Sequence, residues 1–381
     1  DHANIRVALD FCTAQPGEGV TGLRMVSQLD LYWTVRGFLK EARIWVARML
    51  VAAPPDAPER VFAQRVLGWC ALLQGDTEAG VAALADSDEL VRRTDDEVTA
   101  AYVSVGWGMA HLFTERERLA REEFADALAV FRAHGVPDGE GSAGFLYGLA
   151  TAVCGDFTRG RALIAERVAA GEAVGEVFWR SWALWALGMI ELFYGDVAAA
   201  ERAELDAFRL QDVLHNRAAE AFAVHVLGGI AVRREQWERA ATLFGIAATM
   251  WRALGASPFR FGMFTARFAE YGARAFTQLG EQAYKKHFGI GRSLSGQDVT
   301  RYVLDRSYDR AGRGCATRPD NPLTRRETEI AALVAEGLTN REIAARLFIA
   351  QRTVDTHLAH ILTKLCFKSR SQVSAWITGR R

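Results

Sequence analysis

Four short helices are predicted by the stretch from Leu323 to Arg370, which reads LTRRETEIAALVAEGLTNREIAARLFIAQRTVDTHLAHILTKLCFKSR. The first two begin at capping boxes, in which each side chain satisfies a free backbone donor at the helix start: Thr324 with Glu327, and Thr339 with Glu342. Gly337 ends the first helix, because glycine adopts the left-handed conformation at little cost. A turn precedes a third helix over 351–365, and a fourth follows Ser369. A short second helix that a tight turn joins to a longer third helix predicts a helix-turn-helix.

The third helix has two chemically different faces. Its apolar residues recur at helical spacing and are expected to share a buried face: Val354, Leu358, Ile361 and Leu365. The opposite face carries side chains that are small or polar and leave room to approach base edges in a major groove: Arg352, Asp355, Thr356, Ala359, His360 and Thr363. Basic side chains around this face are candidate phosphate contacts: Arg341, Arg352, Lys364, Lys368 and Arg370. The pattern favours DNA binding.

Positive charge is concentrated in this C-terminal stretch. Residues 321–381 carry ten Lys+Arg against five Asp+Glu, whereas the remaining 320 residues carry 36 against 41. A basic module in an otherwise acidic chain is the charge distribution that a DNA-binding domain requires. A plain helical bundle with solvated basic residues is the simpler alternative, and the full residue pattern favours DNA binding over it.

The stretch resembles the C-terminal DNA-binding domain of LuxR/FixJ-type bacterial transcription regulators. The resemblance rests on many positions at fixed spacing, which are Leu323-Thr324, Arg326-Glu327, Glu329-Ile330, Gly337, Thr339-Asn340, Glu342-Ile343-Ala344, Leu347, Thr353-Val354, His357, Ile361, Lys364-Leu365 and Ser369-Arg370. It implies that the third helix is the recognition helix. It also implies that three of its residues face bases: Asp355, Thr356 and Ala359.

Further residues are expected among both the base-facing residues and the phosphate contacts. His360 joins the base-facing residues, while Thr339, Asn340 and His357 join the phosphate contacts. The three base-facing positions that the family implies hold no arginine or lysine, so DNA shape is expected to contribute to specificity. We also expect a homodimer on double-stranded DNA, because one such module makes few phosphate contacts and useful affinity needs two half-sites.

Two positions depart from the family pattern. Ala350 stands where the family usually has serine, so the third helix lacks its usual N-cap at a cost of about 1 kcal/mol. Cys366 stands where the family usually has glycine at the helix end. These departures keep an alternative hypothesis open: a helical-repeat scaffold for protein–protein contact, with a degenerate or silent DNA-binding module.

A repeat of forty residues runs through the preceding part of the chain. It is marked by five glycines: Gly68, Gly108, Gly148, Gly188 and Gly228. A turn follows each glycine, and an apolar residue recurs beyond the turn at Leu84, Phe124, Ile164 and Phe244, with Glu204 as the exception. A fixed period of this size predicts stacked helix pairs, similar to tetratricopeptide repeats with a period stretched beyond the usual ~34 residues. Each glycine is expected to let a neighbouring helix approach closely.

The sequence therefore predicts an all-α protein, in which a tetratricopeptide-like α-solenoid of helix pairs is followed by a four-helix LuxR-type helix-turn-helix domain. The expected domains are N-terminal helices at 1–56, the repeat domain at 57–304, a linker at 305–321 and the DNA-binding domain at 322–381. The N-terminal helices are expected at 2–14, 18–35 and 38–52. The linker is rich in Arg, Gly, Asp and Pro and has no apolar period.

Signals for catalysis, cofactors and membranes are missing from the sequence. It contains no phosphate-binding G-x-x-x-x-G-K-[ST] loop, no G-x-S-x-G elbow and no H-E-x-x-H motif, and its five cysteines form no C-x-x-C pair. We therefore expect no enzyme activity, no cofactor and no metal. No apolar run approaches the roughly 20 residues of a membrane helix, and no signal peptide opens the chain, so we expect a cytoplasmic protein without membrane contact.

The order of a repeat array followed by a helix-turn-helix is similar to that of large LuxR-type regulators of actinobacteria and of MalT-like activators. In those proteins an ATPase domain normally precedes the repeats, and residues 1–10, DHANIRVALD, resemble the junction after such a domain. The resemblance implies a transcription regulator whose array receives a signal from an unknown inducer or protein partner. A truncated gene product that lacks its ATPase is a third hypothesis.

Overall fold

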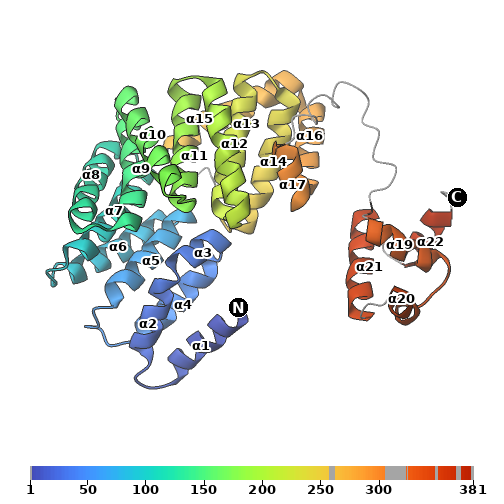
Figure 1. The fold of residues 1–381 in the computed structure, drawn as a ribbon, viewed down its shortest axis with the longest axis horizontal. Helices are drawn as coiled ribbons and strands as arrows, with labels where there is room; N and C mark the ends of the chain where they lie inside the picture. The colour runs from blue at the N-terminus through green and yellow to red at the C-terminus, as the bar shows by residue number, and fades with distance from the viewer. Residues whose placement is uncertain are drawn as a thin grey trace. The chain divides into compact units, whose positions relative to one another are not determined.

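The computed structural model describes residues 2–256, 262–304, 323, 325–347, 351–365 and 370–378. Every regular element in these ranges is an α-helix and none is a strand, which confirms the all-α prediction (Figure 1). The chain divides into two compact units, Asp1–Arg306 and Ser307–Arg381. The predicted linker lies outside the described residues, and the four domain limits set from the sequence stay predictions.

The first unit begins with four helices that precede the repeats. They are α1 (His2–Ala14), α2 (Gly19–Gln28), α3 (Asp30–Arg36) and α4 (Leu39–Ala52). The prediction of a single helix over 18–35 was wrong, because the helix breaks at Leu29, whose φ and ψ are −88° and 12°. The break turns Trp33 into the core, where it is 0% exposed and donates its indole N–H to the carbonyl oxygen of Val26 at 3.1 Å.

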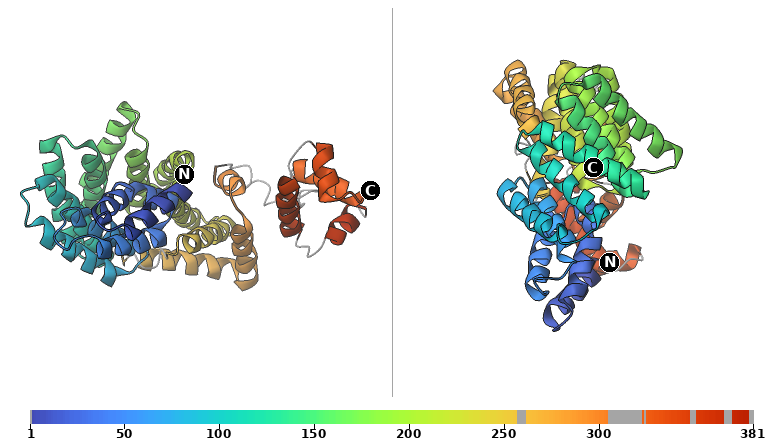
Figure 2. Two further views of the ribbon diagram at one scale, coloured as in Figure 1. Left: turned by 90° about the horizontal axis from the view of Figure 1, so that it is seen from below. Right: turned by 90° about the vertical axis from the view of Figure 1, so that its left-hand side faces the viewer.

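Five antiparallel helix pairs follow, as the forty-residue period predicts. They are α5 (Arg60–Leu73) with α6 (Thr77–Val91), α7 (Glu97–Phe113) with α8 (Glu117–His134), α9 (Pro137–Val153) with α10 (Phe157–Ala173), α11 (Phe178–Tyr194) with α12 (Val197–Leu214), and α13 (Arg217–Arg233) with α14 (Trp237–Ala253). Successive pairs lie side by side in chain order (Figures 1 and 2). One apolar core runs through them from Leu72 to Val303.

The five repeat glycines mark where the two helices of a pair approach most closely. A Cβ atom added at Gly228 would lie 2.6 Å from the ring of Phe244, and one at Gly148 would lie 2.5 Å from Ile164. Gly68 and Gly108 face Leu84 and Phe124 in the same way. Each glycine therefore receives the large side chain sixteen residues later, and the predicted role of these glycines in close approach is confirmed.

The fourth pair breaks this rule at Glu204. Its side chain is 0% exposed and lies over Gly188, where the other pairs place leucine, isoleucine or phenylalanine. Neither carboxyl oxygen has a hydrogen-bond partner among the described residues. Because burial in apolar surroundings disfavours the charged carboxylate, the pKa of Glu204 is raised well above its ordinary value.

The turns within the pairs use two devices. Left-handed backbone closes four of them, with φ of 74° at Gly75, 100° at Gly155, 58° at Glu115 and 59° at Glu235. Aspartate opens the second helix in three pairs, where its carboxylate accepts the backbone N–H three residues later, as Asp196 does from Ala199 at 2.6 Å. Glycine supplies the left-handed conformation at low cost and aspartate satisfies an orphan donor, which explains the turn dipeptides in the sequence.

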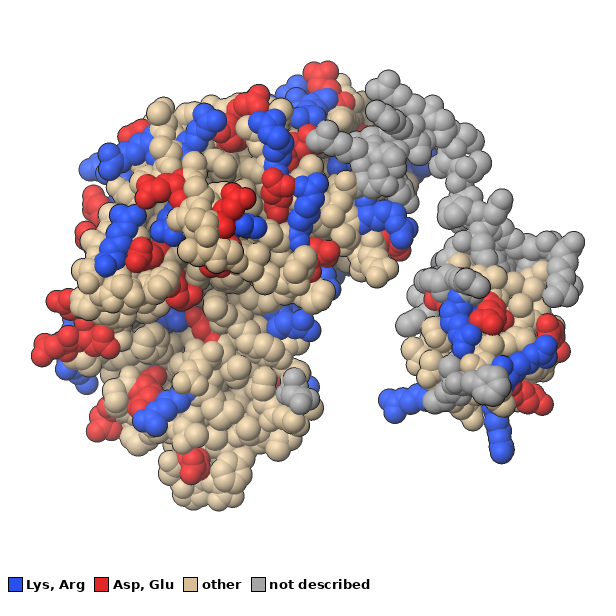
Figure 3. All heavy atoms as spheres, viewed as in Figure 1, with Lys and Arg blue, Asp and Glu red and all other residues tan. Residues whose placement is uncertain are grey.

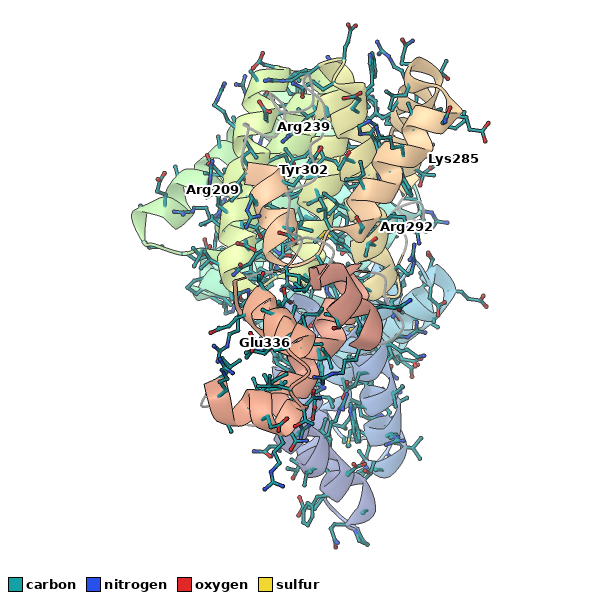
Figure 4. All side chains as sticks on the ribbon, turned by 90° about the vertical axis from the view of Figure 1, so that its right-hand side faces the viewer. Arg209, Arg239, Lys285, Arg292, Tyr302 and Glu336 are labelled. Atoms are coloured by element: carbon teal, nitrogen blue, oxygen red, sulfur yellow. The ribbon has the colours of Figure 1, made fainter. Side chains whose placement is uncertain are left out.

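Three helices follow the pairs: α15 (Gly262–Leu279), α16 (Glu281–Ser293) and α17 (Gln297–Leu304). Helix α16 packs directly on α14, because an added Cβ at Gly245 would overlap the carbonyl oxygen of Phe288, and one at Gly291 would overlap that of Thr242. Helix α17 covers the side of the last pair, where Tyr302 lies under the guanidinium of Arg239 at 5.6 Å (Figure 4).

The array also makes contacts between helices that are far apart in sequence. Helix α3 contacts α13, and α15 contacts α7. The turn after α3 packs on the end of α14, since an added Cβ at Gly37 would lie 2.6 Å from Leu254. These contacts bring the N-terminal helices and the fifth pair together and enclose the inner side of the array.

The second unit contains four short helices around a small core of its own. They are α19 (Arg325–Ala335), α20 (Asn340–Leu347), α21 (Gln351–Leu365) and α22 (Arg370–Thr378). The core side chains include Ile330, Ile343, Val354, Ile361 and Val373, each 0% exposed. These helices match the four predicted for the helix-turn-helix domain.

Candidate nucleic-acid interface

The start of the helix-turn-helix is fixed by a glycine stop and a capping box. Gly337 has a φ of 88°, and the backbone N–H of Leu338 donates to the carbonyl oxygen of Leu333 at 3.2 Å, which closes α19. At the start of α20, the Glu342 carboxylate accepts the Thr339 backbone N–H at 2.7 Å, and Thr339 Oγ1 accepts the Glu342 N–H at 3.3 Å. The second predicted capping box is therefore confirmed. In the first, Thr324 lies outside the described residues.

Helix α21 separates a buried face from an exposed one, as its sequence predicts. Val354 and Ile361 are 0% exposed, and Leu358 packs partly buried against the same core. Arg352, Asp355 and Thr356 are exposed on the other side. The core therefore holds α21 by one face and leaves the face with the predicted DNA contacts open to solvent.

A chain of hydrogen bonds joins α20, α21 and α22 beside this face. Arg370 donates to the side-chain oxygen of Asn340 at 2.6 Å and to the carbonyl oxygen of Leu338. The amide nitrogen of Asn340 donates in turn to Asp355 Oδ1 at 2.7 Å. These bonds hold the Asp355 carboxylate in place at the exposed surface. Sequence spacing did not reveal this chain, because its members lie fifteen and thirty residues apart.

Arg326 makes a second connection that the sequence did not reveal. Its guanidinium donates to the last carbonyl of α20, at Leu347, at 3.2 Å, and pairs with Glu329 at 2.7 Å. A cation at the C-terminus of a helix also complements the helix dipole. Arg326 therefore positions α20 against α19.

The predicted contact residues occupy three kinds of environment. Exposed residues are Thr339, Arg341, Arg352, Asp355 and Thr356, while Asn340, His357 and Arg370 are half-buried. Ala359, His360 and Lys364 lie on α21, but their side chains are outside the described part, as is all of Lys368. Ala350 and Cys366, the two departures from the family pattern, also lie outside it. The roles assigned to all these residues stay predictions.

Both units expose charged side chains of both signs on their described surfaces (Figure 3). Cations and anions are interspersed over the face of the array in Figure 3. In the second unit Arg341 and Arg352 are exposed, and no ion pair engages either of them among the described residues. Exposed, unpaired guanidinium groups beside an open helix face are suited to phosphate oxygens.

The described residues form neither a metal site nor a membrane-spanning helix. No group of three or more His, Cys, Asp or Glu side chains that could hold a metal ion occurs in the described ranges. No helix among the described residues is both long enough and apolar enough to span a membrane.

Residues 321–377 match the family described as bacterial regulatory proteins, luxR family. They therefore form a LuxR-family helix-turn-helix domain, as the sequence pattern predicts. The match covers α19 to α21 and nearly all of α22.

Similar proteins carry names of transcription regulators. A Mycobacterium tuberculosis (strain H37Rv) protein, named as an HTH-type transcriptional regulator, is 30% identical over 154 residues, which is 40% of this chain and 17% of that protein. The nitrate/nitrite response regulator protein NarL of Escherichia coli K12 is 43% identical over 72 residues, covering 19% of this chain and 33% of NarL. The oxygen regulatory protein NreC of Staphylococcus aureus JH9 is 37% identical over 90 residues, covering 24% and 40%. The chain thus spans less than half the length of each.

Proposed function

We propose that this protein is a DNA-binding transcription regulator, in which the helical array controls a LuxR-family domain that binds promoter DNA. The observation that carries the proposal is the exposed polar face of α21, held by a buried apolar face within a LuxR-family domain. Such a helix fits the major groove, where side chains reach the edges of bases. The names of the similar proteins, which are those of regulators, support the same function.

The side chains of the interface have two proposed roles: some position the domain on the DNA backbone, and others recognise bases. Arg341 and Arg352 neutralise phosphates, which sets affinity and orientation without reading sequence. Asp355 and Thr356 face the bases, where a carboxylate accepts from the amino groups of cytosine or adenine. The hydrogen bond from Asn340 fixes the direction of the Asp355 carboxylate. Ala359 and His360 complete the proposed base-facing set, and Thr339, Asn340, His357, Lys364, Lys368 and Arg370 the proposed phosphate contacts.

The protein acts on DNA as a homodimer in this proposal. One module of four short helices makes few phosphate contacts, so two half-sites supply the affinity. The array receives the signal, from an inducer or a protein partner, and transmits it to the DNA-binding domain.

Replacing Arg352 by alanine is expected to weaken the salt dependence of DNA binding by the full chain. Each neutralised phosphate contributes about −0.9 to the slope of log K against log salt, so the variant slope should be smaller by about one unit for each bound module, or about two units for the homodimer. Fluorescence anisotropy with a labelled random-sequence duplex between about 50 and 200 mM salt measures it.

The matched control is Arg209→Ala, which removes the same charge from the exposed surface of α12 in the array. Its slope should equal that of the unaltered protein. Equal slopes for Arg352→Ala and Arg209→Ala would rule out a phosphate contact by Arg352.

A further inference from the structure

A cavity of about 120 Å³ lies on the inner side of the array. Its walls come from the first helices of the five pairs and from α3, and no second helix of a pair contributes. The contacts of α3 with α13 close this space from the N-terminal side. The cavity is therefore a product of the whole array rather than of one repeat.

Aromatic side chains form much of the cavity wall, since nine of its 22 described lining residues are aromatic. Trp179, Trp182 and Trp185 on α11 all line it, together with Phe145 and Phe222 from the neighbouring helices. Trp185 is 5% exposed and packs in the core, and all three tryptophans also line the cavity. The Trp182 ring is parallel to Phe145, at 15° and 6.4 Å, and perpendicular to Trp185, at 88° and 5.6 Å. These rings pack against one another and present a continuous aromatic wall to the cavity.

The size of the cavity limits its occupant. An engineered apolar cavity of about 150 Å³ in another protein holds one benzene molecule. A space of about 120 Å³ is of the same order, so it suits one aromatic ring with a short substituent.

The charge of the residues that line the cavity determines which substituent on an aromatic ring is favoured. Asp30 and Arg65 neutralise each other across 2.5 Å. Asp138 is exposed at the opening and pairs with no cation among the described residues. It accepts the indole N–H of Trp179 at 2.8 Å and the hydroxyl of Tyr102 at 3.4 Å. Burial, reinforced by the nearby carboxylate, raises the pKa of Tyr102 to about 12, so this donor stays neutral.

We propose that the cavity binds a small aromatic amine, with its ring packed against the aromatic wall that Phe145 and Trp182 form and its ammonium group at the Asp138 carboxylate. Indole and phenol faces attract cations, which adds to the charge attraction at the opening. Binding itself is independent of the proposed function, and only its use as a signal for the DNA-binding domain rests on that proposal.

The test compares three probes of similar size by calorimetry on the full chain without DNA: benzylammonium, benzyl alcohol and benzoate. Benzylammonium should bind about tenfold more tightly than benzyl alcohol, since cation–π contact and one carboxylate together correspond to about one factor of ten. Benzoate should not bind measurably. Because no DNA is present, a failure here leaves the proposed DNA binding untouched.

Two variants locate the site. Asp138→Asn keeps the acceptor for Trp179 but removes the charge, so it should abolish the preference for benzylammonium over benzyl alcohol. Asp126→Asn removes the same charge from the exposed surface of α8 and should leave the preference intact. Ala218→Phe places a ring in the cavity wall and should abolish binding of both probes.

Several results would overturn the proposal. Equal affinity for benzylammonium and benzyl alcohol would remove the role of charge, and an unchanged preference in Asp138→Asn would place the amine elsewhere. If no probe binds while the chain unfolds cooperatively, the aromatic walls serve packing alone.

Discussion

Gly291→Ala is expected to lower the free energy of unfolding of the array by about 3 kcal/mol. An added methyl group would overlap the backbone carbonyl of Thr242 and approach the backbone nitrogen of Ile246 to 2.9 Å. Backbone cannot turn aside as a flexible side chain does, so α14 and α16 must separate and lose their packing. Overpacking of this kind costs about 1–3 kcal/mol and occasionally more.

The matched control lies two residues earlier in the same helix. An added Cβ at Gly289 would meet nothing within 4 Å, so Gly289→Ala should raise stability by about 0.5–1 kcal/mol through better helix propensity. Urea unfolding followed by tryptophan fluorescence measures both variants, since nine of the ten tryptophans precede residue 306. Equal stability of the two variants would contradict the direct backbone contact of α14 with α16.

Glu204→Leu is expected to raise the free energy of unfolding by about 2 kcal/mol at neutral pH. A buried polar group without a hydrogen bond costs about 1–3 kcal/mol, and both Glu204 oxygens lack a partner among the described residues. Leucine occupies the equivalent place in the first pair, at Leu84 over Gly68, so its shape is compatible with the site.

The stabilisation should depend on pH in a definite direction. The pKa of Glu204 is raised in the folded chain, so the folded state holds this proton more tightly than the unfolded state does. The stability contributed by the protonated group is fully present below the unfolded pKa, near 4.3, and is lost as pH rises through the raised folded value. The advantage of Glu204→Leu should therefore grow as pH rises above about 4.3.

Glu204→Gln distinguishes the effect of the ionisable charge on stability from the effect of the buried polar group. It should remove the pH dependence that Glu204 adds, while recovering less stability than leucine because the amide remains buried without a partner. Urea unfolding of the three proteins between pH 5 and 8 provides the measurement. A stability difference between Glu204→Leu and the unaltered chain that does not change with pH would show that Glu204 is not held in its neutral form.

The periodic parts of the fold could be predicted from the sequence for a physical reason. Each pair must bury its own apolar faces, so Gly108 with Phe124 and Gly148 with Ile164 repeat one contact at one spacing. Capping is equally local, and Thr339 with Glu342 needs only three residues to specify it. The family pattern then identified the second unit.

Other features depend on contacts that no local spacing encodes. The helix breaks at Leu29 because the break lets Trp33 enter a core shared with α4 and α5. The inner cavity needs α3 to reach α13, more than 180 residues later in the chain. In the same way, the bonds from Arg370 through Asn340 to Asp355 exist only because α20, α21 and α22 pack together.

We propose that the LuxR-family domain gives this chain its affinity for DNA. The most direct measurement compares duplex binding by the full chain with binding by residues 1–306, which form a compact unit with their own core. We predict that the full chain binds a random-sequence duplex with an affinity that falls steeply from about 50 to 200 mM salt, while residues 1–306 do not bind. Equal binding by the two proteins, or no salt-dependent binding by the full chain, would contradict it.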